Sequence, residues 1–208
     1  MKTSERVLKT FELALAVGFA FTLLWGAFSL QRQELLADKL VRLHIIANSD
    51  SEADQTLKLH VRDEVIGLAE GLLRQSDDRA DAERRITAAL PELEALATET
   101  VRAYGYDYAV HAELRNTRFP TREYEDFTLP AGDYLALRLV LGEGAGRNWW
   151  CVVFPPLCAE ATADVSQAAM AAGLSGDDVG LITEEDGGYT LKFRSIELWE
   201  SLRDKLGK

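Results

Sequence analysis

Residue types that catalyse hydrolysis lie close together in the first quarter of the chain. His44 is followed by Ser49, Asp50 and Ser51, so a serine nucleophile with a histidine base can be formulated on paper. No strand–nucleophile–helix elbow of the G-x-S-x-G kind surrounds these serines. Asp50 and Ser51 are also typical of residues that precede a helix. We therefore predict no catalytic residue here.

Metal and cofactor sites receive little support. His60 and Glu64 share one helical face, but zinc-binding helices place two histidines around a glutamate. The glycines at positions 142, 144 and 146 resemble a phosphate loop, yet the Lys-Ser/Thr pair of such loops is missing and a strand pattern follows. We predict no metal, no cofactor and no small-molecule substrate.

Two cysteines, Cys151 and Cys158, are the only ones in the chain. The Pro155-Pro156 bend between them can bring the two within bridging distance. Outside the cytoplasm a disulfide would form, whereas two small buried thiols are the alternative.

The stretch from Leu129 to Cys158 has the clearest strand pattern in the chain, and we expect the other strands and helices to pack around it. Leucines alternate with other residues from Leu135 to Leu141, which indicates a strand with one buried face. Glycines then supply a turn, and the β-rich run Trp149–Phe154 returns. We expect a β-hairpin. Because its return strand is apolar on both faces, that strand is either central in the sheet or has one face that awaits a partner.

The N-terminal stretch predicts a membrane-spanning or export helix. Leu13–Leu30 contains no charged residue, and the basic residues Lys2, Arg6 and Lys9 precede it. Ala27-Phe28-Ser29 resembles a signal-peptide cleavage site, whereas the length of the apolar run favours an uncleaved anchor. Residues 1–30 are therefore predicted to be a signal peptide or membrane anchor.

The middle of the chain alternates strand and helix patterns. Leu40–Ala47 predicts a strand, and Ser51 with Asp54 resembles a capping box for the next helix. The expected apolar stripe of that helix is Leu57, Val61, Val65, Leu68 and Leu72, with Lys58, Arg62 and Asp63 away from it.

A break at residues 76–78 precedes a second helical stretch. We expect Pro91 to start or kink a helix. Gly105 ends the stretch, and Tyr106–Arg115 alternates like a strand. The fold class predicted is α+β, with helices packed on one side of a largely antiparallel sheet and an N-terminal hydrophobic export or anchor helix before it.

The C-terminal residues 159–208 differ in composition from this α+β domain of residues 31–158. We expect a short helix at Ala161–Ala172, a loosely ordered linker at Gly173–Gly188 and a strand at Tyr189–Phe193. Ser195 can cap a final amphipathic helix.

The net charge of the chain limits the classes of partner that it can bind. The chain carries a formal net charge of −11. An acidic protein of this kind is repelled by nucleic acid and by an anionic membrane face, so we expect neither as a partner.

Several strings closely resemble the stage II sporulation protein R family of endospore-forming bacteria, over roughly Leu40 to Cys158. They are His44–Ser51 (HIIANSDS), Asp54-Gln55, Leu57-Lys58-Leu59, Val61-Arg62-Asp63, Phe119–Arg122 (FPTR), Leu129–Tyr134 (LPAGDY) and Asn148–Cys158 (NWWCVVFPPLC).

The resemblance implies a signalling protein, not an enzyme. Members of this family are made in the forespore and exported into the space between forespore and mother cell. There they trigger a membrane-embedded aspartic protease of the mother cell, which removes the pro-sequence of the sporulation sigma factor E. The residues themselves agree with export and with action by binding.

We predict the partner-binding surface in two regions. One is the central strand, where Trp149 or Trp150 can anchor a partner unless both belong to the core. The other is the turn and helix start, which holds more polar groups than capping requires: Asn48, Asp50, Gln55, Arg62 and Asp63. The alternative hypotheses are a membrane-tethered extracytoplasmic hydrolase of cell-wall or peptide substrates, and a structural bridge between the two membranes.

Overall fold

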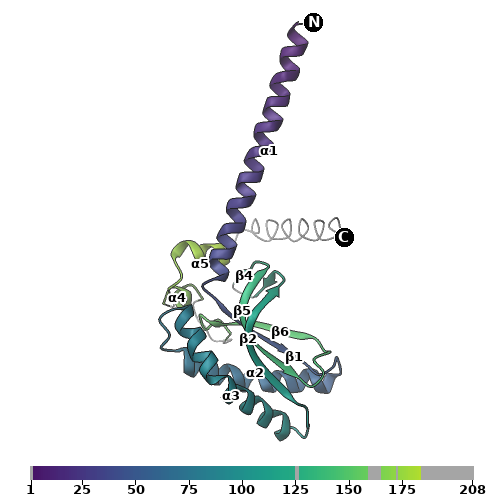
Figure 1. Ribbon diagram of the computed structural model, residues 1–208, viewed down its shortest axis with the longest axis vertical. Coiled ribbons are helices and arrows are strands. Elements are labelled where there is room, and N and C mark those ends of the chain that lie inside the picture. The colour runs from purple at the N-terminus through teal and green to yellow at the C-terminus, as the bar shows by residue number, and fades with distance from the viewer. Residues whose placement is uncertain (1, 125–126, 159–164, 172, 184–208) are drawn as a thin grey trace. The chain divides into compact units, whose positions relative to one another are not determined.

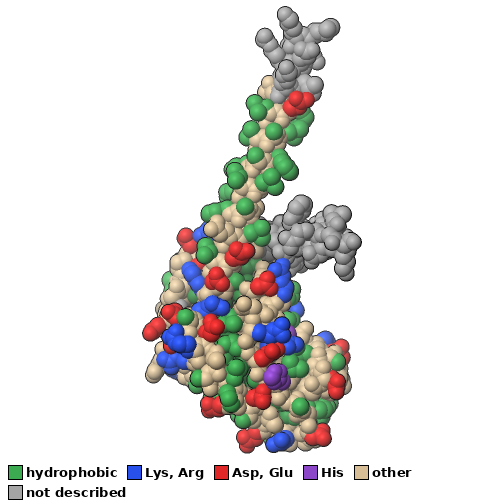
Figure 2. All heavy atoms as spheres, in the orientation of Figure 1, with side chains coloured by type: hydrophobic (Ala, Val, Ile, Leu, Met, Phe, Trp, Pro, Cys, Tyr) green, Lys and Arg blue, Asp and Glu red, His purple; other side chains and the backbone are tan. Residues whose placement is uncertain are grey.

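The N-terminal apolar stretch forms one helix, α1 (Lys2–Ala37), in a computed structural model that describes residues 2–124, 127–158, 165–171 and 173–183 (Figure 1). Its segment Thr10–Ala37 contains an 18-residue window with a mean hydropathy of 2.0 and is long and apolar enough to cross a membrane. Figure 2 shows hydrophobic side chains around this helix. The expected apolar helix is therefore present, and both a signal peptide and an anchor fit it. The chain divides into two units, residues 1–36 and 37–208.

The second unit is built on a four-stranded mixed sheet in the order β2-β5-β1-β6. Its strands are β1 (Val41–Ile46), β2 (Val110–Phe119), β5 (Gly132–Leu141) and β6 (Asn148–Phe154). β1 runs parallel to β5, whereas the β1–β6 and β2–β5 pairs are antiparallel. A small second sheet pairs β3 (Arg122–Glu123) with β4 (Thr128–Leu129). This arrangement confirms an α+β fold with a largely antiparallel sheet.

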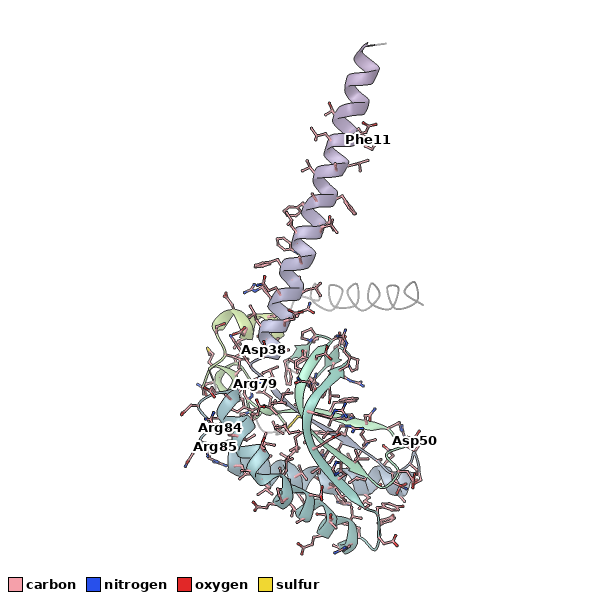
Figure 3. The ribbon with its side chains drawn as sticks, viewed as in Figure 1. Phe11, Asp38, Asp50, Arg79, Arg84 and Arg85 are labelled. Carbon is pink, nitrogen blue, oxygen red and sulfur yellow. A yellow bond between two sulfur atoms is a disulfide. The ribbon has the colours of Figure 1, made fainter. Side chains whose placement is uncertain are left out.

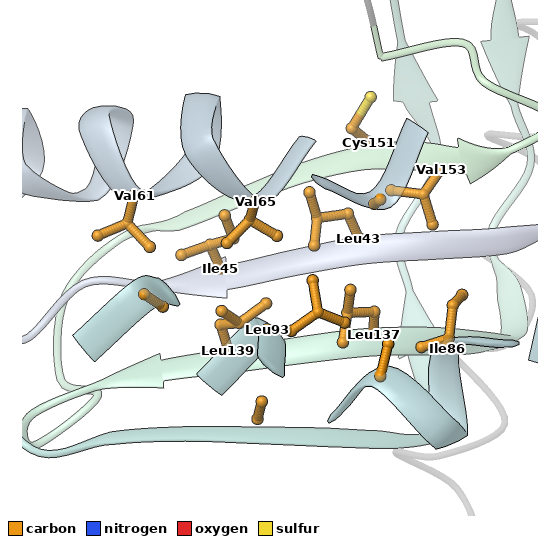
Figure 4. Packing of buried hydrophobic residues seen from close by; sticks show 14 of the residues in the cluster. Leu43, Ile45, Val61, Val65, Ile86, Leu93, Leu137, Leu139, Cys151 and Val153 are labelled. Atoms are coloured by element: carbon orange, nitrogen blue, oxygen red, sulfur yellow. The ribbon is translucent and has the colours of Figure 1, made fainter. Parts of the chain in front are cut away.

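Two long helices, α2 (Glu52–Leu73) and α3 (Arg79–Ala103), pack on the same face of the main sheet (Figure 1). Strand side chains alternate between faces, and the odd-numbered residues of β1 and β5 point toward the helices. Figure 4 shows Leu43, Ile45 and Leu137 of these strands in one cluster with Val61 of α2 and Leu93 of α3. All five side chains are 0 % exposed, so this interface is the core of the domain.

The hairpin expected between Leu135 and Phe154 is wrong. β5 and β6 do not pair with each other, because β1 lies between them: Ile45 is opposite Leu139 on one side and Trp149 on the other. β6 is consequently an edge strand of the described sheet and not a central one. The glycine-containing connection from β5 to β6 has to cross the end of β1.

The cap predicted for α2 is confirmed, since the Ser51 side chain accepts a hydrogen bond from the Asp54 backbone N–H. The first half of the expected stripe is also buried, but toward the C-terminus Ala69 and Leu73 are the buried residues. Lys58 is only 5 % exposed, so its expected position away from the buried stripe is wrong.

The helix α3 begins after its N-cap Asp78, as the break in the sequence indicated, and contains Pro91 without interruption. The prediction that Pro91 starts a helix is therefore wrong. Gly105 follows the helix with φ +84°, a conformation that glycine adopts without steric cost. The strand expected at Tyr106–Arg115 begins later, at Val110, and continues to Phe119.

Beyond β6 the described residues form α4 (Val165–Ala171) and α5 (Gly176–Thr183). The first agrees with the predicted helix at 161–172. The second shows that residues 176–183 of the linker expected at 173–188 are helical, whereas 184–188 lie outside the described residues. Ser175 Oγ caps α5 by accepting from the Asp178 backbone N–H at 3.2 Å, and the Asp178 carboxylate accepts from the Ser175 N–H at 2.8 Å and pairs with Lys39 at 2.5 Å. The strand and final helix expected after Tyr189 lie outside the described residues.

Candidate functional site

Residues 142–147 form a loop, here called the glycine loop, that wraps around the end of β1. Asn48 holds it by both backbone and side chain: its carbonyl accepts from Ala145 N–H at 3.1 Å and its Oδ1 accepts from Glu143 N–H at 2.9 Å. The carbonyl of Ala47 accepts from Gly146 N–H at 2.9 Å. The glycine loop is therefore fixed in place and does not form a flexible hairpin turn.

Two of its glycines are required by this close approach. Gly142 has φ +57°, and a Cβ there would collide with Oδ1 of Asn48. A Cβ on Gly146 would collide with the backbone carbonyl of Ser49. The space that a phosphate would need in a phosphate loop is thus filled by the β1–α2 turn.

Asp54 is the buried acceptor at the centre of that turn, with 4 % exposure. Asn48 Nδ2 donates to Asp54 Oδ2 at 3.0 Å and Ser49 Oγ donates to the same atom at 2.5 Å. Burial alone would raise the pKa of Asp54, but hydrogen bonds donated by Ser49, Asn48 and Tyr108 outweigh it and lower the pKa. The carboxylate is therefore ionised and acts as a structural anchor.

Asp50 and Gln55 also contact the turn and the glycine loop. Asp50, at the tip of the domain in Figure 3, accepts from the backbone N–H of Arg147 at 2.7 Å, and Gln55 Nε2 donates to the carbonyl of Ser49 at 2.9 Å. Lys58 Nζ donates to Gln55 Oε1 at 2.7 Å and to the carbonyl of Arg147 at 2.9 Å, and burial lowers its pKa. Sequence reasoning missed Lys58, whose carbonyl partner is 89 residues away.

Arg62, Asp63 and Trp149 form a second group. The Arg62 guanidinium lies 5.2 Å from the centre of the Trp149 ring and 2.6 Å from the Asp63 carboxylate. Trp149 is half-buried against the core, whereas the Asp63 side chain is 59 % exposed. These three predicted contact residues therefore share one surface patch on the helix side of the sheet.

Trp150 points to the opposite face of the sheet. Its ring stacks on His44 with centroids 3.9 Å apart and meets Phe119 edge-on at 4.6 Å. His44 is 5 % exposed, and its Nε2 is 2.9 Å from Oδ1 of Asn148. Burial, together with the nearby charges of Arg138 and Arg42, lowers the pKa of His44 to about 4, against a smaller opposing effect of Asn148. The imidazole is therefore neutral at physiological pH.

A buried arginine, Arg42, lies beneath this face and was not predicted. It is 0 % exposed, its guanidinium lies 4.1 Å from the Phe119 ring centre and 5.1 Å from that of Tyr134, and its Nη2 donates to the hydroxyl of Tyr124 at 2.6 Å. Burial lowers its pKa. The signal available in the sequence was a charged residue in a strand whose other residues, apart from His44, are apolar.

Cys151 and Cys158 are joined by a disulfide, with their Cα atoms 5.6 Å apart. The backbone N–H of Leu157 folds back onto the carbonyl of Val152 at 3.2 Å. The bridge and this hydrogen bond together close the turn that follows β6.

The arrangement needed for a hydrolase is not formed by the residues that suggested it. His44 is stacked beneath Trp150, Ser49 donates to Asp54, and Ser51 caps α2. His60 stacks on Tyr104 with centroids 4.0 Å apart. Within the described part of the chain, no group of three or more His, Cys, Asp or Glu side chains is placed to hold a metal.

Comparison with known proteins matches this domain to a family. Residues 37–164, which include the whole main sheet, α2, α3 and the glycine loop, match the family Stage II sporulation protein R. Over 124 residues the chain is 41 % identical to the Stage II sporulation protein R of Bacillus subtilis (strain 168). That alignment covers 60 % of this chain and 55 % of the relative, so the chain matches about half of the relative's length. No solved structure matches. Because the family match covers more than half of the chain, the protein belongs to the stage II sporulation protein R family.

Proposed function

We propose that this protein is an exported sporulation signal. It is made in the forespore, crosses the forespore membrane, and in the intermembrane space activates a membrane-embedded aspartic protease of the mother cell. The protease then processes pro-sigma factor E. The observation that carries the proposal is the family match over residues 37–164, together with an N-terminal helix whose 28-residue segment Thr10–Ala37 is long and apolar enough to cross a membrane.

The protein acts by binding and not by catalysis. In support, the polar residues that suggested chemistry each have a structural partner: Ser49 and Asn48 bond to Asp54, and His44 is covered by Trp150. Side chains suited to recognition remain accessible beside them, among them Asp63 and the half-buried tryptophans. Tryptophan and arginine are the residue types most enriched in binding hot spots.

The N-terminal helix delivers the domain. Lys2, Arg6 and Lys9 precede the apolar stretch, and such a basic flank favours the cytoplasmic side of the forespore membrane for this end. The folded domain is then released or stays tethered outside, according to whether the helix is cleaved.

Reconstitution tests the proposal. The full chain is expressed in cells that also contain the cognate membrane protease and the sigma-factor precursor, and precursor cleavage is followed by immunoblot. We expect cleavage that depends on this protein. A variant that lacks residues 1–30 stays in the cytoplasm and serves as the matched control, which should give no cleavage.

Two results would contradict the proposal. One is the absence of precursor cleavage although the full chain is folded, exported and paired with its cognate protease. The other is equal cleavage by the cytoplasmic variant, which would show that export is not required.

A further inference from the structure

The charges of the domain are divided between its two sides. The helix layer, residues 52–103, carries twelve acidic and seven basic side chains. On the opposite face of the main sheet, β2 and β5 present Arg115 and Arg138, Arg42 of β1 is buried beneath them, and Glu113 is the acidic side chain among the described strand residues of that face. An acidic protein thus has one locally basic face.

This face surrounds one tryptophan. The Arg122 guanidinium of β3 lies 5.6 Å from the centre of the Trp150 ring. Arg138 and Arg115 both approach the Glu113 carboxylate, at 2.6 Å and 3.7 Å. The positive charge of Arg138 also acts on His44, directly beneath Trp150, and depresses its pKa. The arginines and the tryptophan therefore form one continuous patch, here called the arginine-rich face: Arg115, Arg122, Arg138 and Trp150.

The arginine-rich face is accessible. The side chain of Arg115 is 59 % exposed, Arg122 is exposed, and Trp150 and Arg138 are half-buried. α2 and α3 cover the other side of the sheet. Arg115 and Arg138 share one carboxylate, Glu113, and Arg122 lies against Trp150. The three arginines therefore outnumber the acidic side chain that the described strand residues of the main sheet place on this face.

We propose that the arginine-rich face binds an acidic segment of the partner protein, with Trp150 as its apolar anchor. The guanidinium group pairs with carboxylates through two parallel hydrogen bonds, which is the chemistry that an Asp/Glu-containing peptide offers. An arginine–tryptophan cluster of this kind is a typical hot spot. This inference rests on the proposed function, since the partner it names is the protein that the signal activates.

A short acidic segment fits this face better than a nucleic acid or an anionic bilayer. Charges beyond about 8 Å are screened at physiological salt, so a peptide on this patch interacts mainly with its arginines. A long polyanion or a membrane surface would also meet the rest of a chain whose net charge is −11.

The first experiment reverses charge in the reconstituted system with the full chain. Arg115→Glu combined with Arg122→Glu is compared with Arg84→Glu combined with Arg102→Glu on α3, which changes the net charge equally on the other side of the domain. We expect the first pair to lower precursor cleavage about tenfold and the α3 pair to leave it unchanged. Equal cleavage by both pairs, with export and circular dichroism as in the wild type, would overturn the proposal.

The second experiment identifies the occupant. A photo-crosslinking amino acid at position 117, on the same face of β2, should capture a protease peptide rich in Asp and Glu, and the Arg115→Glu/Arg122→Glu pair should remove that crosslink. Crosslinks to lipid alone, or to a peptide without acidic residues, would refute the inference.

Failure of the proposed function gives a different pattern. If the wild type triggers no cleavage, the activator role fails. Crosslinking at position 117 in the same cells then tests the arginine-rich face by itself. A crosslink to an Asp/Glu-rich protein peptide that is lost with the charge reversal would support binding at this face. The absence of any protein crosslink would refute it.

Discussion

Replacing Asp54 by alanine tests whether the β1–α2 turn is a structural clamp. The carboxylate is 4 % exposed and accepts hydrogen bonds from Asn48 Nδ2 at 3.0 Å and Ser49 Oγ at 2.5 Å, with a further one from Tyr108. Its loss leaves those donors without their acceptor and frees the end of β1 to which the glycine loop is attached.

The magnitude follows from these contacts. A hydrogen bond to a charged group contributes about 1.5–3 kcal/mol, and a buried donor without a partner costs about 1–3 kcal/mol. The contacts share one acceptor, so their effects do not add, and Ser49 is half-exposed and regains water. We expect Asp54→Ala to lower the free energy of unfolding of the domain by about 3 kcal/mol.

Urea unfolding of the full chain in mild detergent measures this change, with Trp149 and Trp150 as fluorescence reporters within the domain. Asp63→Ala is the matched control on the same helix, because that side chain is 59 % exposed and should change stability by less than about 0.5 kcal/mol. A double-mutant cycle with Asn48→Ala should give a coupling of about 1 kcal/mol. Equal stability of Asp54→Ala and the wild type would refute the clamp.

Three further predictions concern the other groups. Reduction of the Cys151–Cys158 bridge should lower the free energy of unfolding by about 2.5 kcal/mol from loop entropy, and the native protein should show no titratable thiol; two thiols without reductant would exclude the bridge. The pKa of His44 is about 4 in the folded state and 6.5 ordinarily, so the unfolded chain binds the proton at a higher pH than the folded one. The free energy of unfolding should therefore fall by up to about 3 kcal/mol between pH 7 and pH 4. This part of the pH profile should vanish in His44→Phe. Alanine at Arg62 or Asp63 should reduce protease activation while export and stability stay close to those of the wild type, and full activation by both variants would exclude this patch.

Features that depend on neighbours in sequence were predictable. The Ser51–Asp54 cap requires two residues three positions apart, and the buried positions Leu57, Val61 and Val65 recur with the helical period. Strand alternation likewise identified Leu135–Leu141. Each of these features is decided within about one turn of helix or one strand of chain.

The strand order was not predictable in this way. Glycines between two β-rich runs are the usual signature of a hairpin, and nothing local distinguishes a turn from a wider loop that encloses a third strand. The strand order depends on β1, because this strand buries Leu43 and Ile45 on the helix side and pairs with both β5 and β6. Gly142 and Gly146 are needed there for close approach to Asn48 and Ser49.

Buried cations were missed for a related reason. Lys58 follows Leu57 on the buried side of α2, but its charge led us to expect a solvent-exposed side chain. Its hydrogen-bond acceptor, the carbonyl of Arg147, lies in the glycine loop and comes near only when that loop packs against the β1–α2 turn. Arg42 is tolerated because the rings of Phe119 and Tyr134 lie against its guanidinium. In both cases the compensating group lies far away in sequence.

The geometry changes how alanine substitutions among the predicted contact residues must be interpreted. Asn48, Asp50 and Gln55 hold the glycine loop or the turn beneath it, so their loss would reduce activation through the fold even if no partner touches them. Asp63 is exposed, so its substitution should change the free energy of unfolding little. Trp150 is intermediate, because its ring covers His44 and is itself half-buried. A defect in activation therefore identifies a contact only where the free energy of unfolding is unchanged, and Arg115 and Arg122 are the positions where that separation should be cleanest.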